Sequence, residues 1–290
     1  MPIALVTGTS TGIGLQTALH LARHGFEVKA ALRNPARGVL LEEAAANESL
    51  PVEIVSMDVT VDASVTDCIG GILEREGALD VLVNNAGLSG AAPLEDVPLD
   101  EHRQMFEANY FGAIRTIQAV LPAMRERGTG TIVNVSSVTG RVAVPNQVPY
   151  TASKHAIEAA SEALAAEVAA HGIRIAIIEP GVFATNIWEN SAEATRYDRD
   201  SPYQHIMRRN GKMYASLLRQ AGDPAEVARV IHRAIVAETP KLRWVVGDDA
   251  HAMIAGRGAV SDEDFLTLGA ELTDEECDAA YRRILGLSIF

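Results

Sequence analysis

Residues 3–14 read IALVTGTSTGIG and set the architecture of this chain. The apolar run Ile3–Val6 predicts a strand, and the glycine-rich turn Thr7–Gly14 follows it directly. A helical pattern over Leu15–His24 comes next and is closed by Gly25. A glycine-rich turn is a weak signal by itself, but one that joins a strand to a helix is typical of sites that bind the phosphates of a dinucleotide.

The three spaced glycines of this turn have separate roles. Gly8 allows a tight turn, Gly12 leaves the backbone open to a phosphate, and Gly14 lets the helix pack close to the sheet. The N-terminus of the helix then offers free N–H groups and a partial positive charge to a pyrophosphate. The cofactor-binding residues predicted in the turn are Gly8, Thr9, Ser10, Thr11, Gly12, Ile13 and Gly14.

Strand and helix patterns alternate along the rest of the chain. Further apolar runs predict strands at 26–32, 52–56, 81–84, 131–135, 173–178 and 242–246. Helical patterns between them include 63–76, 99–127 and 150–171. This alternation predicts an α/β fold, a Rossmann-type doubly wound parallel sheet of about seven strands with helices on both faces. No repeat or linker marks a boundary, so residues 1–290 are expected to form a single domain.

Composition and charge exclude several classes of protein. The chain carries 25 Lys and Arg against 38 Asp and Glu, and its net charge of −13 argues against a nucleic-acid-binding surface. Cys68 and Cys277 lie far apart and show no spacing typical of a disulfide, a redox motif or a zinc site. His102 and His155 have no further ligand at a suitable spacing, so neither a disulfide nor a metal is predicted. No apolar run approaches the roughly 20 residues that span a bilayer, and the N-terminus lacks the basic segment of a signal peptide. The expected location is the cytoplasm.

The end of the second predicted strand bears on the choice of cofactor. Sites for NAD usually place an acidic residue there, which binds the ribose hydroxyls. Residues 29–37 read KAALRNPAR and hold no acid, whereas Arg33 is placed to pair with a 2′-phosphate, with Arg37 or Lys29 as helpers. NADP(H) is therefore favoured over NAD(H), and a solvated surface side chain is the other interpretation of Arg33.

Two more stretches are expected at the same edge of the sheet. Asp58 and Val59 follow the third strand, where Asp58 can accept a hydrogen bond from the adenine amino group or cap a turn, and the two uses are compatible. NNAG follows the fourth strand, where its amides can brace the sheet and line a cofactor cleft. Asn85, Ala86 and Gly87 are therefore predicted cofactor contacts.

The segment YTASK places Tyr150 and Lys154 on one face of a predicted helix. A free tyrosine has a pKa of about 10 and is a poor base at neutral pH, but a nearby ammonium lowers that pKa. Ser137, 13 residues before Tyr150, is placed to hold a substrate oxygen as charge develops on it. Ser136 competes for this role, although strand alternation points the two serines in opposite directions. Together with the glycine turn, the set predicts a general acid/base.

TGTSTGIG, NNAG, Ser137, YTASK and the EPG of Glu179–Gly181 together resemble the short-chain dehydrogenase/reductase family, in its single-domain branch with a TGxxxGxG turn. The resemblance implies that Tyr150 donates and accepts the proton and that Ser137 orients the substrate oxygen. It implies that Lys154 binds the nicotinamide ribose and lowers the pKa of the tyrosine, and that Asn109 helps to hold a water in a proton relay. Positions beside the nicotinamide are matched by Pro180, Gly181, Val182 and Thr185.

Within the family, LRNPAR and DPAEVARVIHRAIVAETPKLRW are similar to the branch with estradiol 17β-dehydrogenase and certain retinol dehydrogenases. This likeness implies NADP(H) and a lipophilic alcohol or ketone. Residues 182–222 break the strand–helix pattern and are expected to form a lid on the substrate side, while 261–285 is expected to be helical and acidic. The predicted substrate-binding residues are Ser137, Val138, Val144, Asn146, Tyr150, Phe183 and Tyr203.

The function predicted from these observations is an NAD(P)-dependent oxidoreductase that transfers hydride between nicotinamide and a hydroxyl or carbonyl carbon. The glycine spacing disfavours a sugar-nucleotide epimerase or dehydratase. The alternative is a catalytically inactive NADP(H)-binding regulator, although such proteins typically lose the Tyr or the Lys that this chain keeps. The resemblance also implies a homodimer or homotetramer built on the helices at 99–127 and 150–171. Neither the substrate nor the direction of the reaction follows from the sequence.

Overall fold

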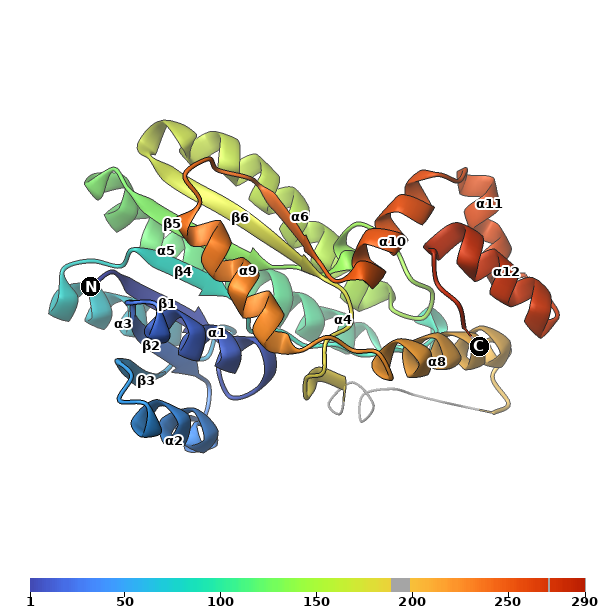
Figure 1. The fold of residues 1–290 in the computed structure, drawn as a ribbon, viewed down its shortest axis with the longest axis horizontal. Helices are drawn as coiled ribbons and strands as arrows, with labels where there is room; N and C mark the ends of the chain where they lie inside the picture. The colour runs from blue at the N-terminus through green and yellow to red at the C-terminus, as the bar shows by residue number, and fades with distance from the viewer. Residues whose placement is uncertain (189–198, 271, 290) are drawn as a thin grey trace.

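The computed structural model describes residues 1–188, 199–270 and 272–289. Within them a seven-stranded, all-parallel sheet has the order β3-β2-β1-β4-β5-β6-β7 (Figure 1). The predicted fold class is confirmed, including the last strand. The strands are β1 (Ile3–Thr7), β2 (Glu27–Leu32), β3 (Val52–Ser56), β4 (Val81–Asn84), β5 (Gly130–Val135), β6 (Ile173–Pro180) and β7 (Arg243–Val246).

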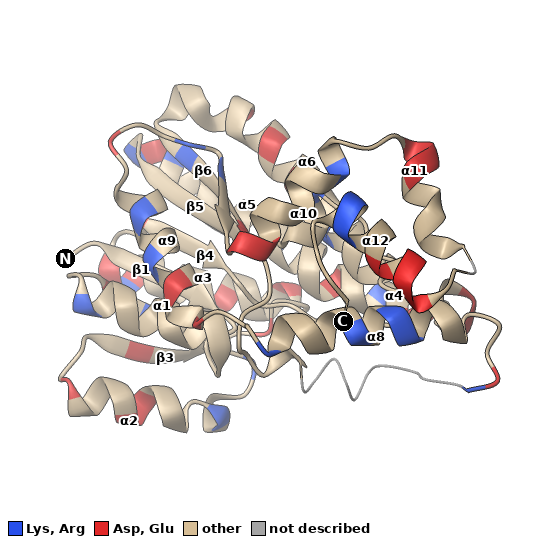
Figure 2. Ribbon diagram, turned by 45° about the vertical axis from the view of Figure 1, so that its right-hand side comes forward, with Lys and Arg blue, Asp and Glu red and all other residues tan. Residues whose placement is uncertain are grey.

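The central strands are buried on both faces. Every residue of β1, β4 and β5 is buried, which explains why these strands read as continuous apolar runs. Figure 2 shows the same strands free of charged residues, while acidic and basic residues are spread over the outer helices. The chain leaves β1 toward β2 on one side and later returns to β4 on the other. In such sheets ligands bind at the carboxyl ends of the strands, beside this reversal.

Two helical layers enclose the sheet (Figure 1). Alternate residues of β1 point to opposite layers, because Ala4 and Val6 join one buried cluster whereas Ile3 and Leu5 join the other. One layer consists of α1 (Gly12–Arg23), α2 (Val39–Asn47) and α9 (Pro224–Val236), and the other of α3 (Asp62–Glu76), α5 (Gly112–Arg127) and α6 (Val148–Val168).

The helix predicted over 99–127 is not continuous. α4 (Leu99–Phe106) passes into a π-helical turn over Glu107–Phe111, and α5 follows. The turn holds Asn109, whose side chain bonds to the backbone of Leu88. A π-helical turn inside a helix often marks a functional site. The helix predicted over 150–171 is α6 followed by a 3₁₀ turn at Ala169–His171.

The C-terminal part adds a third buried cluster beyond the sheet. Four helices form this C-terminal cap, namely α8 (Gln204–Leu218), α10 (Asp248–Gly258), α11 (Asp262–Leu266) and α12 (Asp274–Leu285). α12 begins with a capping box between Thr273 and Glu276 and ends at Gly286, whose φ is 68°. The acidic C-terminal segment is thus largely helical and forms part of the cap. No described helix is long and apolar enough to cross a membrane. Of the expected lid at 182–222, residues 189–198 lie outside the described residues.

Candidate active site

The glycine turn packs tightly against the loop that follows β4. Gly8 has a φ of 71° and Gly12 a φ of 57°, values that favour glycine. A Cβ on Gly8 would lie 2.8 Å from Cα of Ala86, and one on Gly14 would overlap the carbonyl oxygen of Gly8. Side chains at these positions would force the turn to move.

Asn85 and Thr7 fasten the turn in place. The Asn85 side chain donates to the carbonyl oxygens of Thr7 at 2.9 Å and Gly8 at 3.1 Å. In return, the Thr7 hydroxyl accepts from the backbone N–H groups of Asn85 and Ala86, each at 2.9 Å. Asn85 therefore both braces the sheet and lines the cleft described next.

A cavity of about 730 Å³, the glycine cleft, opens over this turn. Its volume lies in the range of pockets that hold small ligands and cofactors. Thr9 does not line it, since this residue is buried and its hydroxyl donates to Ala31 at 3.3 Å. Of the predicted cofactor contacts, the cleft is lined by Gly8, Ser10, Thr11, Gly12, Ile13, Gly14, Arg33, Asp58, Val59, Asn85, Ala86, Gly87 and Thr185.

The basic residues near β2 divide into two groups. Arg33 and Arg37 are exposed and line the glycine cleft. Lys29 is only 2% exposed, and its ammonium pairs with Glu27 and Glu53 at 2.7 Å and with Glu76 at 2.6 Å. These carboxylates outweigh the effect of burial and raise the pKa of Lys29. Lys29 therefore does not help to bind a phosphate, contrary to one expectation.

Asp58 closes a turn at the rim of the glycine cleft. Its Oδ1 accepts from the backbone N–H of Thr60 at 2.9 Å and from the Thr60 hydroxyl at 2.7 Å. Its own N–H donates to Ser64 at 2.9 Å. The turn function is thus present, and Asp58 is also one of the residues that line the cleft.

Ser137, Tyr150 and Lys154 meet at a second cavity. Ser137 follows β5, and its Oγ accepts from the N–H of Thr139 at 3.2 Å. Tyr150 lies in the first turn of α6, and Lys154 lies one turn later with its Nζ 5.8 Å from the centre of the tyrosine ring. The ammonium donates to the carbonyl oxygen of Val135 at 2.9 Å. The three side chains thus come from adjacent elements at the carboxyl edge of the sheet.

The two adjacent serines act on different neighbours. Burial raises the pKa of both Tyr150 and Glu158. The hydroxyl of Ser137 opposes this rise at Tyr150, and the hydroxyl of Ser136 opposes it at Glu158. Ser137 is therefore the serine on the side of the phenol.

Burial dominates the titration of the Tyr–Lys pair. It raises the pKa of Tyr150, an effect that Ser137 and Thr139 oppose, and it lowers the pKa of Lys154 to about 8, an effect that Glu158 opposes. The expected lowering of the tyrosine pKa is not what this structure gives. Lys154 is 7% exposed, and its ammonium bonds to a backbone carbonyl oxygen. Burial therefore disfavours the charge of Lys154 as well.

Substitution of Lys154 by Met is expected to raise the free energy of unfolding at pH 7 by about 2 kcal/mol. Burial lowers the pKa of Lys154 from 10.5 to about 8, which means that the charged lysine destabilises the folded state by about 3 kcal/mol. Loss of the hydrogen bond to Val135 in the variant offsets about 1 kcal/mol of the gain. Lys154 binds its proton less tightly in the folded state than in the unfolded state. It therefore destabilises the fold by the full amount below about pH 8, and this effect disappears as the pH rises to 10.5. Urea unfolding at pH 7 and at higher pH measures this gain, which should shrink as the pH rises. Lys241→Met, at an exposed lysine, is the control, and an equal gain there would contradict the account.

Asn109 is held by three hydrogen bonds. Its Oδ1 accepts from the N–H of Leu88 at 2.7 Å, and its Nδ2 donates to the Leu88 carbonyl and to the Ser153 hydroxyl, each at 3.0 Å. A cavity of about 10 Å³, lined by both Asn109 and Lys154, lies beside it. This is close to the smallest volume that holds one water.

The second cavity, the apolar pocket, measures about 110 Å³. It shares Ile13, Asn85 and Thr185 with the glycine cleft, so the two cavities adjoin. Besides Ser137, Tyr150 and Lys154, the predicted residues that line it are Ile13, Asn85, Gly87, Val138, Pro180, Gly181, Val182, Phe183 and Thr185.

Three predicted substrate-binding residues lie elsewhere. Val144 is buried in the cluster of the C-terminal cap. Asn146 has a φ of 61°, and its carbonyl oxygen accepts from Ala92 at 2.8 Å. The hydroxyl of Tyr203 donates to Glu95 at 2.8 Å. The structure uses these residues in packing and in turns, and they do not line the apolar pocket.

Several lining residues were missed by the sequence reasoning. α8 contributes Met213, Tyr214 and Leu217, whose spacing is that of one helical face and could have signalled a buried surface. The Tyr214 hydroxyl donates to Gln147 at 2.6 Å, and both line the pocket. The other residues that were missed are Leu88, Ser89, Val135, Thr139, Ile187, Trp188 and Met253.

The segment after β6 is fixed by an acid that the sequence did not single out. Asp249, at the start of α10, accepts from the N–H of Val182 at 2.7 Å. The N–H of Gly181 donates to Val246 of β7 at 2.9 Å. Asp249 thereby ties the C-terminal cap to Val182, which lines the apolar pocket.

Comparison with known proteins agrees with this geometry. The family model for short chain dehydrogenases matches residues 2–196. The uncharacterized oxidoreductase YusZ of Bacillus subtilis is 39% identical over 251 residues, which cover 84% of this chain and 89% of that protein. Retinol dehydrogenase 8 of Bos taurus is 37% identical over 250 residues, which cover 82% of this chain and 79% of that protein.

Solved structures give the same result. A short-chain dehydrogenase from Streptomyces avermitilis superposes with a TM-score of 0.77 and 34% identity, over 92% of this chain and 94% of that one. A gluconate 5-dehydrogenase from Burkholderia cenocepacia, in complex with NADP and tartrate, gives a TM-score of 0.71 and 27% identity, over 86% and 95% of the two chains. With the parallel sheet, the glycine turn and the Ser–Tyr–Lys arrangement, these matches show that the chain is an oxidoreductase that belongs to the short-chain dehydrogenase family.

Proposed function

We propose that this protein transfers hydride between NADP(H) and the alcohol or carbonyl carbon of a lipophilic substrate, with Tyr150 as general acid/base. The observation that carries the proposal is that Ser137, Tyr150 and Lys154 line an apolar pocket that adjoins the glycine cleft. A bound nicotinamide would supply or accept the hydride. A panel of lipophilic ketones and alcohols, followed by cofactor absorbance, tests the proposal, and an absence of turnover with every compound would favour the inactive regulator.

The glycine cleft fits the cofactor on structural grounds. The turn leaves no room for a Cβ at Gly8 or Gly14, and its backbone lies beside the N-terminus of α1. That arrangement suits a pyrophosphate. Asp58 would face the adenine end, and Thr185, which lines both cavities, would face the nicotinamide end.

The phenol of Tyr150 would donate a proton to the carbonyl oxygen in reduction and take it back in oxidation. Ser137 would hold the same oxygen by a hydrogen bond. Lys154 would bind the nicotinamide ribose. The cavity beside Asn109 and Lys154 offers a place for one water, through which a proton could pass between solvent and the lysine.

The lining of the apolar pocket supports a lipophilic substrate. The C-terminal cap contributes Met213, Leu217 and Met253, and Trp188 comes from the segment after β6. Apolar walls with few polar groups bind apolar ligands and orient them through those few groups. Retinol dehydrogenase 8, a relative by sequence, is named for such an alcohol.

Arg33→Asp is expected to weaken NADPH binding by about 10- to 100-fold and to leave NADH binding within about threefold. A charge-assisted hydrogen bond to a 2′-phosphate contributes about 1.5–3 kcal/mol, and NADH lacks that phosphate. Fluorescence titration with each cofactor measures both affinities. Arg219→Asp makes the same change of net charge at an exposed residue that does not line the cleft. Tighter binding of NADH than of NADPH by the unmodified protein would contradict the preference.

Residues 1–290 would act as one domain, because the C-terminal cap completes the apolar pocket. A homodimer or homotetramer built on α4, α5 and α6 is part of the proposal. Two large apolar side chains in this region are exposed and support the proposal. Leu99, at the start of α4, is 63% exposed, and Phe111, in the π-helical turn between α4 and α5, is 46% exposed.

A further inference from the structure

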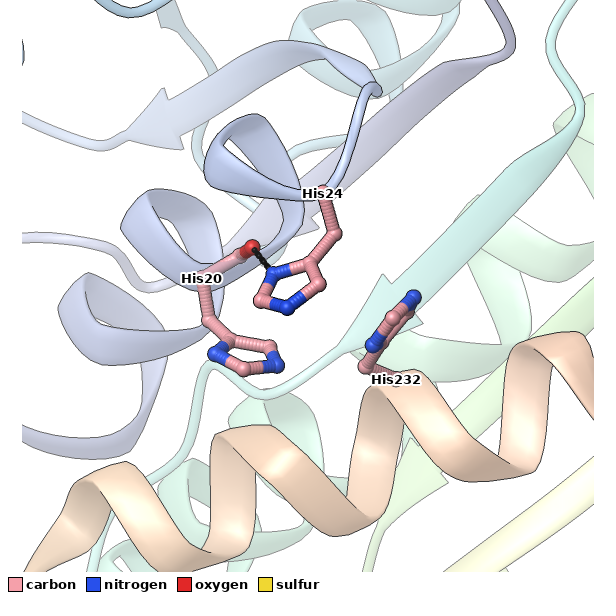
Figure 3. Close-up of side chains that lie close together, drawn as sticks. All are labelled: His20, His24 and His232. Atoms are coloured by element: carbon pink, nitrogen blue, oxygen red, sulfur yellow. Dashed lines mark hydrogen bonds between the residues drawn. The ribbon is translucent and has the colours of Figure 1, made fainter.

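Three histidines from two helices converge away from the active site (Figure 3). His20 lies in the last turn of α1, His24 caps its C-terminus, and His232 lies in α9. The centres of the His20 and His24 rings are 4.1 Å apart, and His232 lies 5.3 Å and 4.6 Å from them. The glycine turn meets the other end of α1, about 18 Å away along a 12-residue helix. The cluster is thus separate from the glycine cleft.

The donor atoms are close enough to share one metal ion. One ring nitrogen from each histidine lies within 4.8 Å of the other two. Zinc–nitrogen bonds of about 2.0–2.1 Å in a tetrahedral site place the nitrogens about 3.4 Å apart. The rings would therefore approach one another by about 1.4 Å at most. His24 is exposed and the other two side chains are half-buried, so modest side-chain rotation can close this distance.

One ring is already oriented as a ligand would be. His24 Nδ1 lies 2.7 Å from the carbonyl oxygen of His20, as Figure 3 shows. Because a carbonyl oxygen only accepts, Nδ1 carries the proton and Nε2 keeps its lone pair. Histidines that bind metals commonly donate their second nitrogen in this way, which fixes the tautomer and the ring.

The surroundings select the class of ion. The three donors are all imidazoles, and Arg23 and Arg229 are the charged neighbours that act on His20. Arg23 is held by Glu48, with its Nε 2.7 Å from Oε2. A set without carboxylates does not suit Mg²⁺ or Ca²⁺, which require oxygen ligands, whereas imidazoles suit Zn²⁺, Ni²⁺ and Cu²⁺.

We propose that His20, His24 and His232 bind one divalent transition-metal ion, with Zn²⁺ as the representative, and that solvent completes its coordination. Since α1 and α9 pack side by side on one face of the sheet, the ion would link two helices that are more than 200 residues apart in the chain. The site would be structural, because it stands apart from both cavities of the active site.

Calorimetric titration of the tag-free, chelator-treated full-length protein with Zn²⁺ at about pH 8 tests the site, because imidazole with its ordinary pKa of about 6.5 is then neutral. We expect one ion per chain. His24→Ala and His232→Ala should each weaken binding by at least about 100-fold. His155→Ala is the matched control, because its Nδ1 also bonds to a carbonyl oxygen four residues earlier and it belongs to no such cluster in the described chain.

Thermal unfolding gives an independent measurement. Zn²⁺ at about a hundred times its Kd should raise the Tm by about 5 °C in the unmodified protein and in His155→Ala, and much less in His232→Ala. NADPH affinity should not respond to the ion. Binding that persists in His232→Ala, one ion for two chains, or no binding at all would overturn the proposal and leave the cluster as packed aromatic rings.

Discussion

Tyr150→Phe is expected to lower kcat by about 1,000-fold and to leave NADPH binding within about twofold. The substitution removes only the phenolic oxygen, so the first turn of α6 and the pocket wall keep their packing. The loss would fall on proton transfer, because the phenol of Tyr150 is the group proposed to exchange a proton with the substrate oxygen. Steady-state kinetics on any ketone found to be a substrate gives kcat, and cofactor fluorescence gives the affinity.

Tyr214→Phe is the matched control for this experiment. Tyr214 lines the same pocket, but its hydroxyl donates to Gln147, and its substitution should change kcat by less than about tenfold. A Tyr150→Phe variant that retains most of the activity would remove Tyr150 from the chemistry and would leave the family assignment untouched.

Gly14→Ala is expected to weaken NADPH binding by about 100-fold and to lower the free energy of unfolding by about 2 kcal/mol. The added Cβ would overlap the Gly8 carbonyl oxygen and would press on the side chain of Asn85. Both groups belong to the bonds that hold the turn, so the turn must shift to admit the methyl group. Fluorescence titration and urea unfolding measure the two effects.

Gly70→Ala is the control, because Gly70 lies in a helix where a side chain can be added without a clash. It lies inside α3, and apart from its chain neighbours and the backbone of its own helix no atom comes within 4 Å of a Cβ built there. Alanine should stabilise the helix by about 0.5–1 kcal/mol and leave cofactor binding unchanged. If Gly14→Ala bound NADPH as tightly as this control, the glycine turn would not be the phosphate site.

The parts of the fold that sequence reasoning could predict are those governed by local pattern. β1, β4 and β5 are buried on both faces, so each is a continuous apolar run. Such a run can be identified as a strand without knowing which segments pack against it. The spacing of the glycines in the turn is equally readable from the local sequence, and a Cβ on Gly14 would overlap the Gly8 carbonyl oxygen six residues earlier. The requirement on Gly8, by contrast, comes from Ala86 in the loop after β4. All seven predicted strands agree with the structure within two residues at each end.

The features that were missed depend on contacts between distant segments. The π-helical turn at Glu107–Phe111 accompanies the bonds of Asn109 to Leu88, which no helical pattern contains. The sequence left Lys29 as a possible phosphate ligand because its three acidic partners are spread over residues 27–76 and do not form a local pattern with it. The histidine cluster escaped notice because His232 is more than 200 residues from the other two, and spacing along the chain shows only the pair on α1.

The methionines of the C-terminal cap bear on how broad a range of substrates this enzyme can accept. Met213 and Met253 are buried in the cluster that holds the cap together, and they also line the apolar pocket. Methionine is unbranched and adjusts its shape at little cost, so such a wall accommodates molecules of different outlines. Selection could then redirect the enzyme to a new substrate through α8 and α10 alone, while the strand ends that carry the chemistry stay as they are.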